Sequence, residues 1–114
     1  MHRAPYVSAK WGVIGLMKAL AIELGPFNIR ANAICPGGVE GDRLDSVIER
    51  EAAAKGVPAE EVREAYTTGT SMRRLVSPTD IANMAVFLAS DAAQLVSGQA
   101  IAVDGHTEHP EPKF

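Results

Sequence analysis

Two short apolar segments, each followed by a glycine-containing turn, direct this chain to an α/β architecture. Apolar and polar residues alternate over residues 28–35 before the turn at 36–38, and residues 99–103 precede a turn at 104–105, so both segments are expected to be strands. Residues 77–80 predict a helix start, because serine suits the N-cap, proline the first helical position and an acid the first turn. A strand, a crossover helix and a second strand predict one right-handed parallel βαβ unit.

An amphipathic helix is expected before the first strand. Its apolar residues recur every three to four positions and predict a wide buried face made of Val13, Leu16, Met17, Leu20 and Leu24. Gly25 is expected to cap this helix in the left-handed conformation, and Pro26 cannot continue it. Small residues one turn apart, at Ala9, Gly12 and Gly15, predict that another backbone approaches closely, so that the helix is buried on more than one side.

The remaining segments complete the expected order of elements. Two charged, amphipathic helices are expected between Asp42 and Gly69, split at residues 56–58, and we interpret them as a mobile helical insertion. The helix that begins at Ser77 is expected to end near Ser90 and to bury Ile81, Ala85 and Leu88. The proline-containing tail is expected to be frayed.

Length and charge limit the classes of protein to consider. A chain of 114 residues is expected to form one compact unit at most, and two parallel strands are too few for a stable sheet, so we expect the end of a larger α/β domain. A net charge of −3 argues against a nucleic-acid partner. Lys18 and Glu23 interrupt the longest apolar stretch, so no membrane anchor is expected. No secretory signal is recognisable, and a single cysteine favours a reducing compartment, which predicts a cytoplasmic protein.

One pair of residues suggests proton-transfer chemistry. Tyr6 and Lys10 are four residues apart in a predicted helix, so their side chains share a face one turn apart. A phenol loses its proton near pH ~10 in water, and an ammonium ~4 Å away favours the phenolate by ~4 kcal/mol at an effective dielectric of ~20. Such a pair could exchange protons near neutrality. The spacing alone is weak evidence, because it also occurs by chance.

Other motifs in the same chain make this tyrosine–lysine spacing a more specific signal. Four further motifs follow in order, Asn-Ala-Ile-Cys-Pro-Gly at 32–37, Ser-Pro-Thr-Asp-Ile-Ala at 77–82, Val-Ser-Gly-Gln at 96–99 and Val-Asp-Gly at 103–105. With them, the sequence resembles the short-chain dehydrogenase/reductase family from about Arg3 to Gly105. The resemblance implies that residues 1–114 are the C-terminal portion of a single domain, a Rossmann-like doubly wound parallel sheet whose N-terminal half is absent. It also implies that the insertion at 41–71 closes over substrate.

The resemblance implies an NAD(P)-dependent oxidoreductase that acts on an alcohol/ketone pair. Tyr6 would be the general acid/base, and Lys10 would hold the nicotinamide ribose and favour the ionised form of the tyrosine. Pro36 and Gly37 match the turn beside the nicotinamide, and the backbone of Val39 would meet its carboxamide. The cofactor would be NAD or NADP, which the residues do not distinguish, and the substrate a small alcohol or carbonyl compound.

Departures from the family pattern leave a second interpretation open. The sequence has no glycine-rich GxxxGxG turn for the pyrophosphate and no matching catalytic serine upstream of Tyr6. Gly41 stands where a threonine is usual, and His106 replaces the second glycine of Asp-Gly-Gly. We therefore expect residues 1–114 alone to be inactive. The alternative is a truncated, non-catalytic association module.

Other candidate sites are weaker. A homo-oligomer is expected from the resemblance, with Trp11, Val13 and Met17 as candidate contacts. His106, Glu108 and His109 could suggest a metal site, but a solvated tail is favoured and no metal is expected. Cys35 is interpreted as a small apolar residue rather than a nucleophile. Arg73 and Arg74 could bind an anion as a fork, although a solvated surface is favoured.

Overall fold

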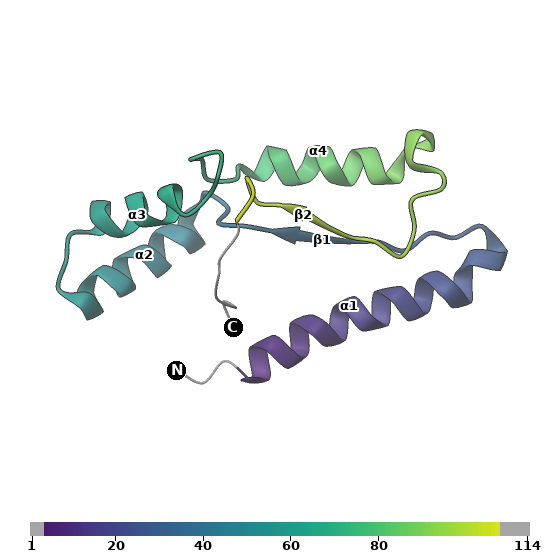
Figure 1. The fold of residues 1–114 in the computed structure, drawn as a ribbon, viewed down its shortest axis with the longest axis horizontal. Coiled ribbons are helices and arrows are strands. Elements are labelled where there is room, and N and C mark those ends of the chain that lie inside the picture. Colours follow the sequence, from purple (N-terminus) through teal and green to yellow (C-terminus); the bar gives the residue numbers. More distant parts are fainter. Residues whose placement is uncertain (1–3, 108–114) are drawn as a thin grey trace. The chain divides into compact units, whose positions relative to one another are not determined.

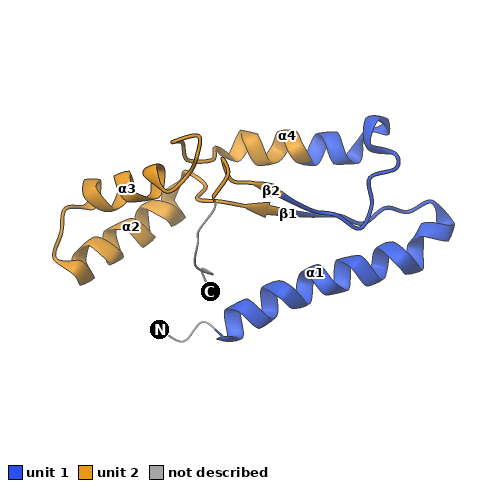
Figure 2. Ribbon diagram, viewed as in Figure 1, with its two compact units in different colours: residues 1–34, 85–101, 109–114 blue, residues 35–84, 102–108 orange. Residues whose placement is uncertain are grey.

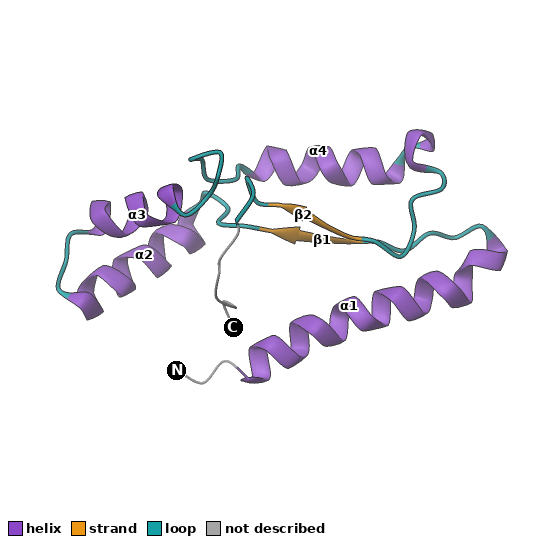
Figure 3. Cartoon of the chain, in the orientation of Figure 1, coloured by secondary structure: helices purple, strands orange, loops and turns teal. Residues whose placement is uncertain are grey.

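The structure, a computed structural model, describes residues 4–107 (Figure 1). Its elements follow one another in the order α1 (Ala4–Leu24), a 3₁₀ turn η1 (Gly25–Phe27), β1 (Ala33–Pro36), α2 (Asp42–Lys55), α3 (Ala59–Thr68), α4 (Pro78–Ala89), a second 3₁₀ turn η2 (Asp91–Ala93) and β2 (Ala100–Val103). Figure 3 shows this alternation of helices and strands. The mixed α/β class predicted from the sequence is confirmed.

The two strands form a parallel sheet. Ala33 N donates a hydrogen bond to the Gln99 carbonyl at 2.9 Å, and Gly37 N donates to the Val103 carbonyl at 3.0 Å. The donors advance from 33 to 37 while the acceptors advance from 99 to 103, and this shared direction is the register of parallel strands. The predicted parallel strand order, with helices in the connection, is confirmed.

The first strand begins later than the sequence pattern predicts. We expected residues 28–35, whereas β1 covers Ala33–Pro36. Asn28 has a left-handed backbone with φ of 60° and closes the η1 turn by donating to the Gly25 carbonyl at 2.9 Å. Asparagine tolerates this conformation better than most residues. The expected left-handed cap at Gly25 is therefore wrong. The chain continues through the 3₁₀ turn, whose first positions accept proline, and Asn28 adopts the left-handed conformation instead.

The start of α4 agrees with its sequence signal. Asp80 N donates to Ser77 Oγ at 3.1 Å, and Ser77 N donates to Asp80 Oδ2 at 2.8 Å. These reciprocal bonds satisfy amides that a helix terminus otherwise leaves without a partner. Hydrogen bonds from the Ser77 backbone and side chain hold the pKa of the Asp80 carboxyl below its usual value. The helix ends at Ala89, next to the expected Ser90.

The predicted helical insertion is present as α2 and α3, split at residues 56–58. Gly56 has a positive φ of 68° and caps α2 by donating to the Ala52 carbonyl. The two helices share a small core in which Ile48, Ala52 and Val62 are buried. Tyr66 Oη donates to Glu51 Oε2 at 3.1 Å across the pair. The insertion is thus a helical hairpin with its own apolar core.

The chain divides into two compact units (Figure 2). Of the residues that the structure describes, the first unit contains 4–34 and 85–101, and the second contains 35–84 and 102–107. The first unit therefore holds α1 and the loop before β2. The second unit holds the α2–α3 hairpin and the turns that follow both strands.

Burial of the helices differs from the sequence prediction. In α1 only Met17 is buried, whereas Val13, Leu16 and Leu20 are exposed, and an added Cβ at Gly12 or Gly15 would meet nothing within 4 Å. In α4 Leu88 is buried as expected, Ile81 is half-buried and Ala85 is exposed. Apolar residues on several sides of a helix indicate that it packs against other elements on more than one side. In the described residues, most of these α1 side chains are exposed instead. Within the same residues, no helix is long and apolar enough to cross a membrane.

Candidate active site

The proposed catalytic pair lies on the first turns of α1. Tyr6 and Lys10 are separated by one helical turn, and Lys10 Nζ lies 5.5 Å from the centroid of the Tyr6 ring. At this distance an ammonium is attracted to the aromatic face. Tyr6 is 53% exposed. The helix therefore brings together the two side chains that the sequence spacing singled out.

The pair combines a phenol with a nearby ammonium. Tyr6 is the third residue of α1, and Lys10 follows it on the same face one turn later. A phenol placed in this way can release a proton to a substrate oxygen and take it back, which is general acid/base chemistry.

A second group of residues lies where the first strand ends. Pro36 is the last residue of β1, and Gly37 N donates to the Val103 carbonyl at 3.0 Å. A Cβ on Gly37 would lie 2.8 Å from Asp104 Cβ and 2.9 Å from Asp104 Cα, which is too close for any side chain. Glycine is therefore required because the turns after β1 and β2 touch. Ligands of open α/β sheets bind outside this carboxyl edge of the strands.

Val39 offers its backbone to one side of this turn. It forms an isolated parallel bridge with Val76, in which Glu40 N donates to the Val76 carbonyl at 2.7 Å and Val76 N donates to the Gly38 carbonyl at 2.9 Å. These bonds use the N–H of Glu40 and the C=O of Gly38, the residues on either side of Val39. In extended backbone the N–H and C=O of Val39 itself then point to the opposite side. A ligand amide on that side could exchange hydrogen bonds with Val39.

The predicted site residues fall into two groups by unit. Tyr6 and Lys10 lie in the first compact unit, and Pro36, Gly37 and Val39 lie in the second. The structure brings together the members of each group. The placement of one group against the other stays a prediction.

Several contacts that anchor α1 were not expected from the sequence. Lys18 Nζ donates to the Gly98 carbonyl at 2.7 Å, and Gly98 has a positive φ of 71° that suits this close turn. Asn32 Nδ2 donates to the Val96 carbonyl at 2.8 Å, while its Oδ1 accepts from Gln99 N at 3.2 Å. Residues 30–32 thus bond the loop before β2 mainly through side chains, and Gly98 N also donates to the Ala31 carbonyl at 2.7 Å. The paired residues of β1 begin after this segment, at Ala33.

A signal for these anchors was available in the sequence. Asn32 and residues 96–99 both belong to motifs that carry the family resemblance, but spacing alone gave them no partner. The structure pairs the two motifs with each other. Ser97 adds a further bond by accepting from Ala31 N at 3.2 Å. These bonds fix the segment before β1 to the loop before β2, and the Lys18 bond to Gly98 ties α1 to the same loop.

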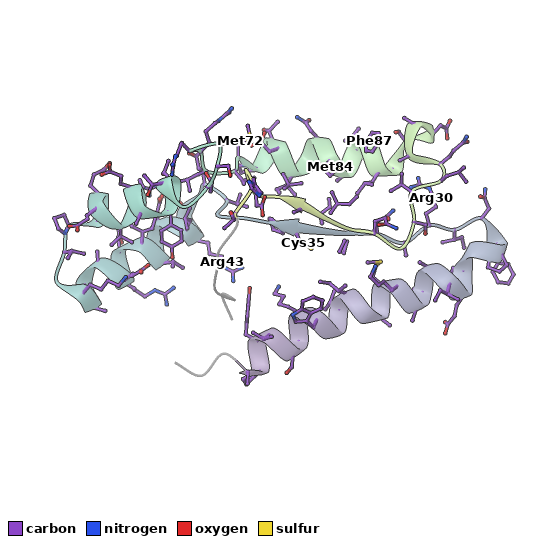
Figure 4. All side chains as sticks on the ribbon, viewed as in Figure 1. Arg30, Cys35, Arg43, Met72, Met84 and Phe87 are labelled. Atoms are coloured by element: carbon purple, nitrogen blue, oxygen red, sulfur yellow. The ribbon has the colours of Figure 1, made fainter. Side chains whose placement is uncertain are left out.

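The cysteine and the histidine that the sequence suggested as further candidates have the following surroundings. Cys35 is half-buried within β1 (Figure 4). The described residues contain no cluster of three side chains that could hold a metal ion, and Glu108 and His109 lie outside them. His106 instead makes a hydrogen bond through Nδ1 with Ser71 Oγ.

The arginine pair lines a hollow of about 350 Å³ on the second unit. Arg73 Nη1 donates to the Thr68 carbonyl, and the neighbouring Arg63 forms an ion pair with Asp45. Arg74 also contributes to the lowered pKa of Asp80. The lining includes two carboxylates beside the three guanidinium groups, from Glu40, Arg63, Arg73, Arg74 and Asp80. Because these charges oppose one another, the hollow favours structural ion pairing over capture of an anion.

Comparison with known proteins identifies relatives over nearly the whole chain. Residues 1–106 match the family model described as enoyl-(acyl carrier protein) reductase. A putative ketoacyl reductase of Streptomyces coelicolor is 38% identical over 105 residues, which cover 92% of this chain and 40% of that protein. The chain thus spans about 40% of the length of the curated relative that it matches.

Solved structures agree with the fold. An actinorhodin polyketide ketoreductase variant determined with NADPH has a TM-score of 0.83 and 38% identity, covering 92% of this chain and 40% of its own. A short chain dehydrogenase family protein from Francisella tularensis has a TM-score of 0.83 and 30% identity, covering 88% of this chain and 41% of its own. On its motifs, its βαβ unit and these matches, the chain belongs to the short-chain dehydrogenase/reductase family.

Proposed function

We propose that residues 1–114 are the C-terminal portion of a single domain of an NAD(P)-dependent oxidoreductase that interconverts an alcohol and a ketone. The observation that carries the proposal is the position of Lys10 Nζ, 5.5 Å from the Tyr6 ring centroid on the first turns of α1. In a chain of this family, that pair has the chemistry to move the proton that accompanies hydride transfer.

Tyr6 is the general acid/base of the proposed reaction. In the reducing direction a hydride adds to the carbonyl carbon, and the Tyr6 phenol gives its proton to the carbonyl oxygen, so that an alcohol forms. In the oxidising direction the phenolate takes the hydroxyl proton back. Lys10 donates hydrogen bonds to the ribose hydroxyls of the cofactor. A bound nicotinamide supplies or accepts the hydride.

The second group of residues fits the nicotinamide end of such a cofactor. Gly37 lets the turn after β1 approach Asp104 closely, and Pro36 leaves no N–H at the strand end. The N–H and C=O of Val39 point away from Val76, which suits the amide of a carboxamide. These residues are the proposed contacts to NAD or NADP, and none of them touches the part of the cofactor in which the two differ.

The helical insertion at 41–71 is the proposed cover of the substrate. It begins two residues after Val39, and its core of Ile48, Ala52 and Val62 makes α2 and α3 one packed body. A hairpin with its own core keeps its shape when it moves as a unit. The proposed substrate is a small alcohol or carbonyl compound. The single cysteine supports the proposal of a cytoplasmic location, because it offers no internal disulfide.

Exposed apolar residues on α1 support association with further structure. Trp11 is 59% exposed and Val13 is 60% exposed, and both stay proposed contacts of a homo-oligomer. Leu16 is also 60% exposed, whereas Met17 is 7% exposed and offers little surface for such a contact. The same surface favours a second candidate function, in which the chain is a non-catalytic association module.

A chimera distinguishes the two functions. The N-terminal part of the Streptomyces coelicolor ketoacyl reductase is joined to residues 1–114, and NADPH and NADH oxidation is followed with a panel of ketones. We expect the chimera to reduce a ketone and the 114-residue chain alone to be inactive. A chimera that folds and binds cofactor without turnover would contradict the oxidoreductase proposal and support the association module.

A further inference from the structure

A tight turn closes the end of β2 around His106. Its backbone N–H donates to Asp104 Oδ1 at 2.8 Å, and Thr107 Oγ1 donates to the Asp104 carbonyl at 3.3 Å. His106 has a positive φ of 63°, a left-handed conformation that residues other than glycine adopt only where their surroundings fix it. In the matching family motif a glycine would meet this backbone requirement without strain. Histidine therefore occupies a backbone conformation that glycine adopts more readily.

The ring is held by the segment that follows the helical insertion. His106 Nδ1 and Ser71 Oγ form a hydrogen bond. Two backbone bonds run parallel to it, because Ser71 N donates to the His106 carbonyl at 2.9 Å and Met72 N donates to the Gly105 carbonyl at 3.1 Å. A Cβ added to Gly105 would lie 3.6 to 3.7 Å from atoms of this segment. Residues 70–74 thus pack directly on the turn after β2.

Residues 70–74 are themselves rigidly linked to the end of α3. Thr70 is buried at 8% exposure, and its Oγ1 donates to the Thr67 carbonyl at 3.1 Å. The same oxygen accepts from Arg74 N at 3.1 Å. A buried polar side chain with all these bonds satisfied fixes the path of the backbone around it. Whatever holds Ser71 therefore also holds the last turn of α3.

A hollow of about 270 Å³ lies beside this junction. Its lining joins the segment after α3 to the end of β2, through Met72, Arg74, Leu75, Val76, Asp80, Val103 and Gly105. Met72 is therefore both a bonded neighbour of Gly105 and part of the wall. A shift of the segment relative to β2 changes the shape of this wall.

We propose that His106 is a positioning residue: its ring bond to Ser71 ties the carboxyl end of the helical insertion to the end of β2 and fixes the wall formed by Met72. The existence of the tie stands on the geometry alone. Its effect on substrate rests on the proposed function, in which the insertion covers the substrate. In this proposal His106 acts through the segment that it holds.

Amide hydrogen exchange of the 114-residue chain tests the tie. Ser71→Ala removes the hydroxyl, and we expect the protection of the Ser71 and Met72 amides to fall about 3- to 10-fold, while that of the Val62 amide in α3 is unchanged. His106→Gly keeps the backbone conformation and removes the ring, and the same loss is expected. His106→Asn should restore protection, because asparagine accepts a positive φ and carries a polar atom in the place of Nδ1.

A double-mutant cycle separates the tie from effects on the backbone. Once His106→Gly is made, Ser71→Ala should cause no further loss, because the change in backbone preference at position 106 is common to both arms and cancels. Unchanged protection in Ser71→Ala overturns the proposal. So do losses that add in the double variant, or an asparagine at 106 that protects no better than glycine.

Kinetics of the chimera test the effect on the site. Ser71→Ala and His106→Gly should raise KM about 3- to 10-fold and leave kcat within twofold, because they shift a wall and touch no reacting atom. If the exchange coupling is found while KM is unchanged, the positioning role is overturned and the role of Tyr6 is unaffected. An inactive chimera counts against the proposed function, whereas the exchange result is read independently of activity.

Discussion

At the scale of single residues, this structure separates positions that local geometry fixes from positions that only the neighbours fix. Tyr6 and Lys10 meet because four residues make one helical turn. Gly37 is required for a different reason, namely the approach of Asp104 from a distant part of the chain. A spacing rule can find the first relation, and no local rule can find the second.

Gly37→Ala should destabilise the second unit. The new Cβ would lie 2.8 Å from Asp104 Cβ, so the two turns must separate, and we expect a loss of about 1 to 3 kcal/mol in the free energy of unfolding. Gly12→Ala is the matched control, because that site is open and helical, and alanine there should add about 0.5 to 1 kcal/mol. Urea denaturation of both variants measures the difference. Equal stability of the two variants would refute the close approach.

At the scale of elements, helix ends were predicted better than strand ends. The start of α4 depends on bonds between Ser77 and Asp80, three residues apart, so the sequence contains the whole signal. The start of β1 depends instead on Asn32, whose side chain bonds residues 96 and 99. That contact spans more than sixty positions, and a strand pattern over 28–35 cannot show which of its residues join the ladder.

The bonds at the start of α4 make part of the stability depend on pH. The Asp80 pKa is lower in the folded chain than its ordinary value of 3.8, mainly because the Ser77 backbone donates to the carboxylate. A lowered folded pKa means that the contribution is complete above the ordinary pKa and is lost as the pH falls through the folded pKa. Thermal unfolding measured from neutral to acidic pH should therefore show a larger acid-induced decrease for the parent chain than for Asp80→Asn.

A variant of the partner residue checks the origin of that effect. Ser77→Ala removes the N-cap hydroxyl and should cost about 1 kcal/mol at neutral pH, while part of the pH dependence persists because the Ser77 backbone amide still donates. Glu60→Gln serves as the control, because Glu60 lies in the first turn of α3 and, in the part of the chain that the structure describes, that helix start has no side-chain capping bond. If Asp80→Asn and the parent chain lose stability in parallel on acidification, the capping account is wrong.

At the scale of the whole molecule, the class and the parallel strand order were predictable, whereas burial was not. Periodicity marked Val13, Leu16 and Leu20 as apolar, and they are, but they are exposed in this structure. A pattern reports that a face prefers to be covered and does not report what covers it. The sequence predicted two groups of site residues, and their roles and the placement of one group against the other stay predictions.

Association should depend on the exposed face of α1. Leu16, at 60% exposure, lies one turn from the apolar Val13 and Leu20, so Leu16→Glu should weaken self-association in sedimentation velocity experiments at several concentrations. Leu95→Glu is the control, because Leu95 is 94% exposed and lies outside the helix. An identical concentration dependence for the two variants would exclude this face of α1 as the contact surface.

The most direct measurement of the central claim compares the two tyrosines of the chain in the active chimera. Tyr6→Phe removes the phenol oxygen beside Lys10, and Tyr66→Phe removes one that donates to Glu51 in the α2–α3 hairpin. Both kcat and the cofactor dissociation constant are measured. We predict that Tyr6→Phe lowers kcat by about 10² to 10⁴-fold with cofactor affinity within a fewfold, and that Tyr66→Phe leaves kcat nearly unchanged. Full turnover in Tyr6→Phe would contradict the assignment of proton transfer to this residue.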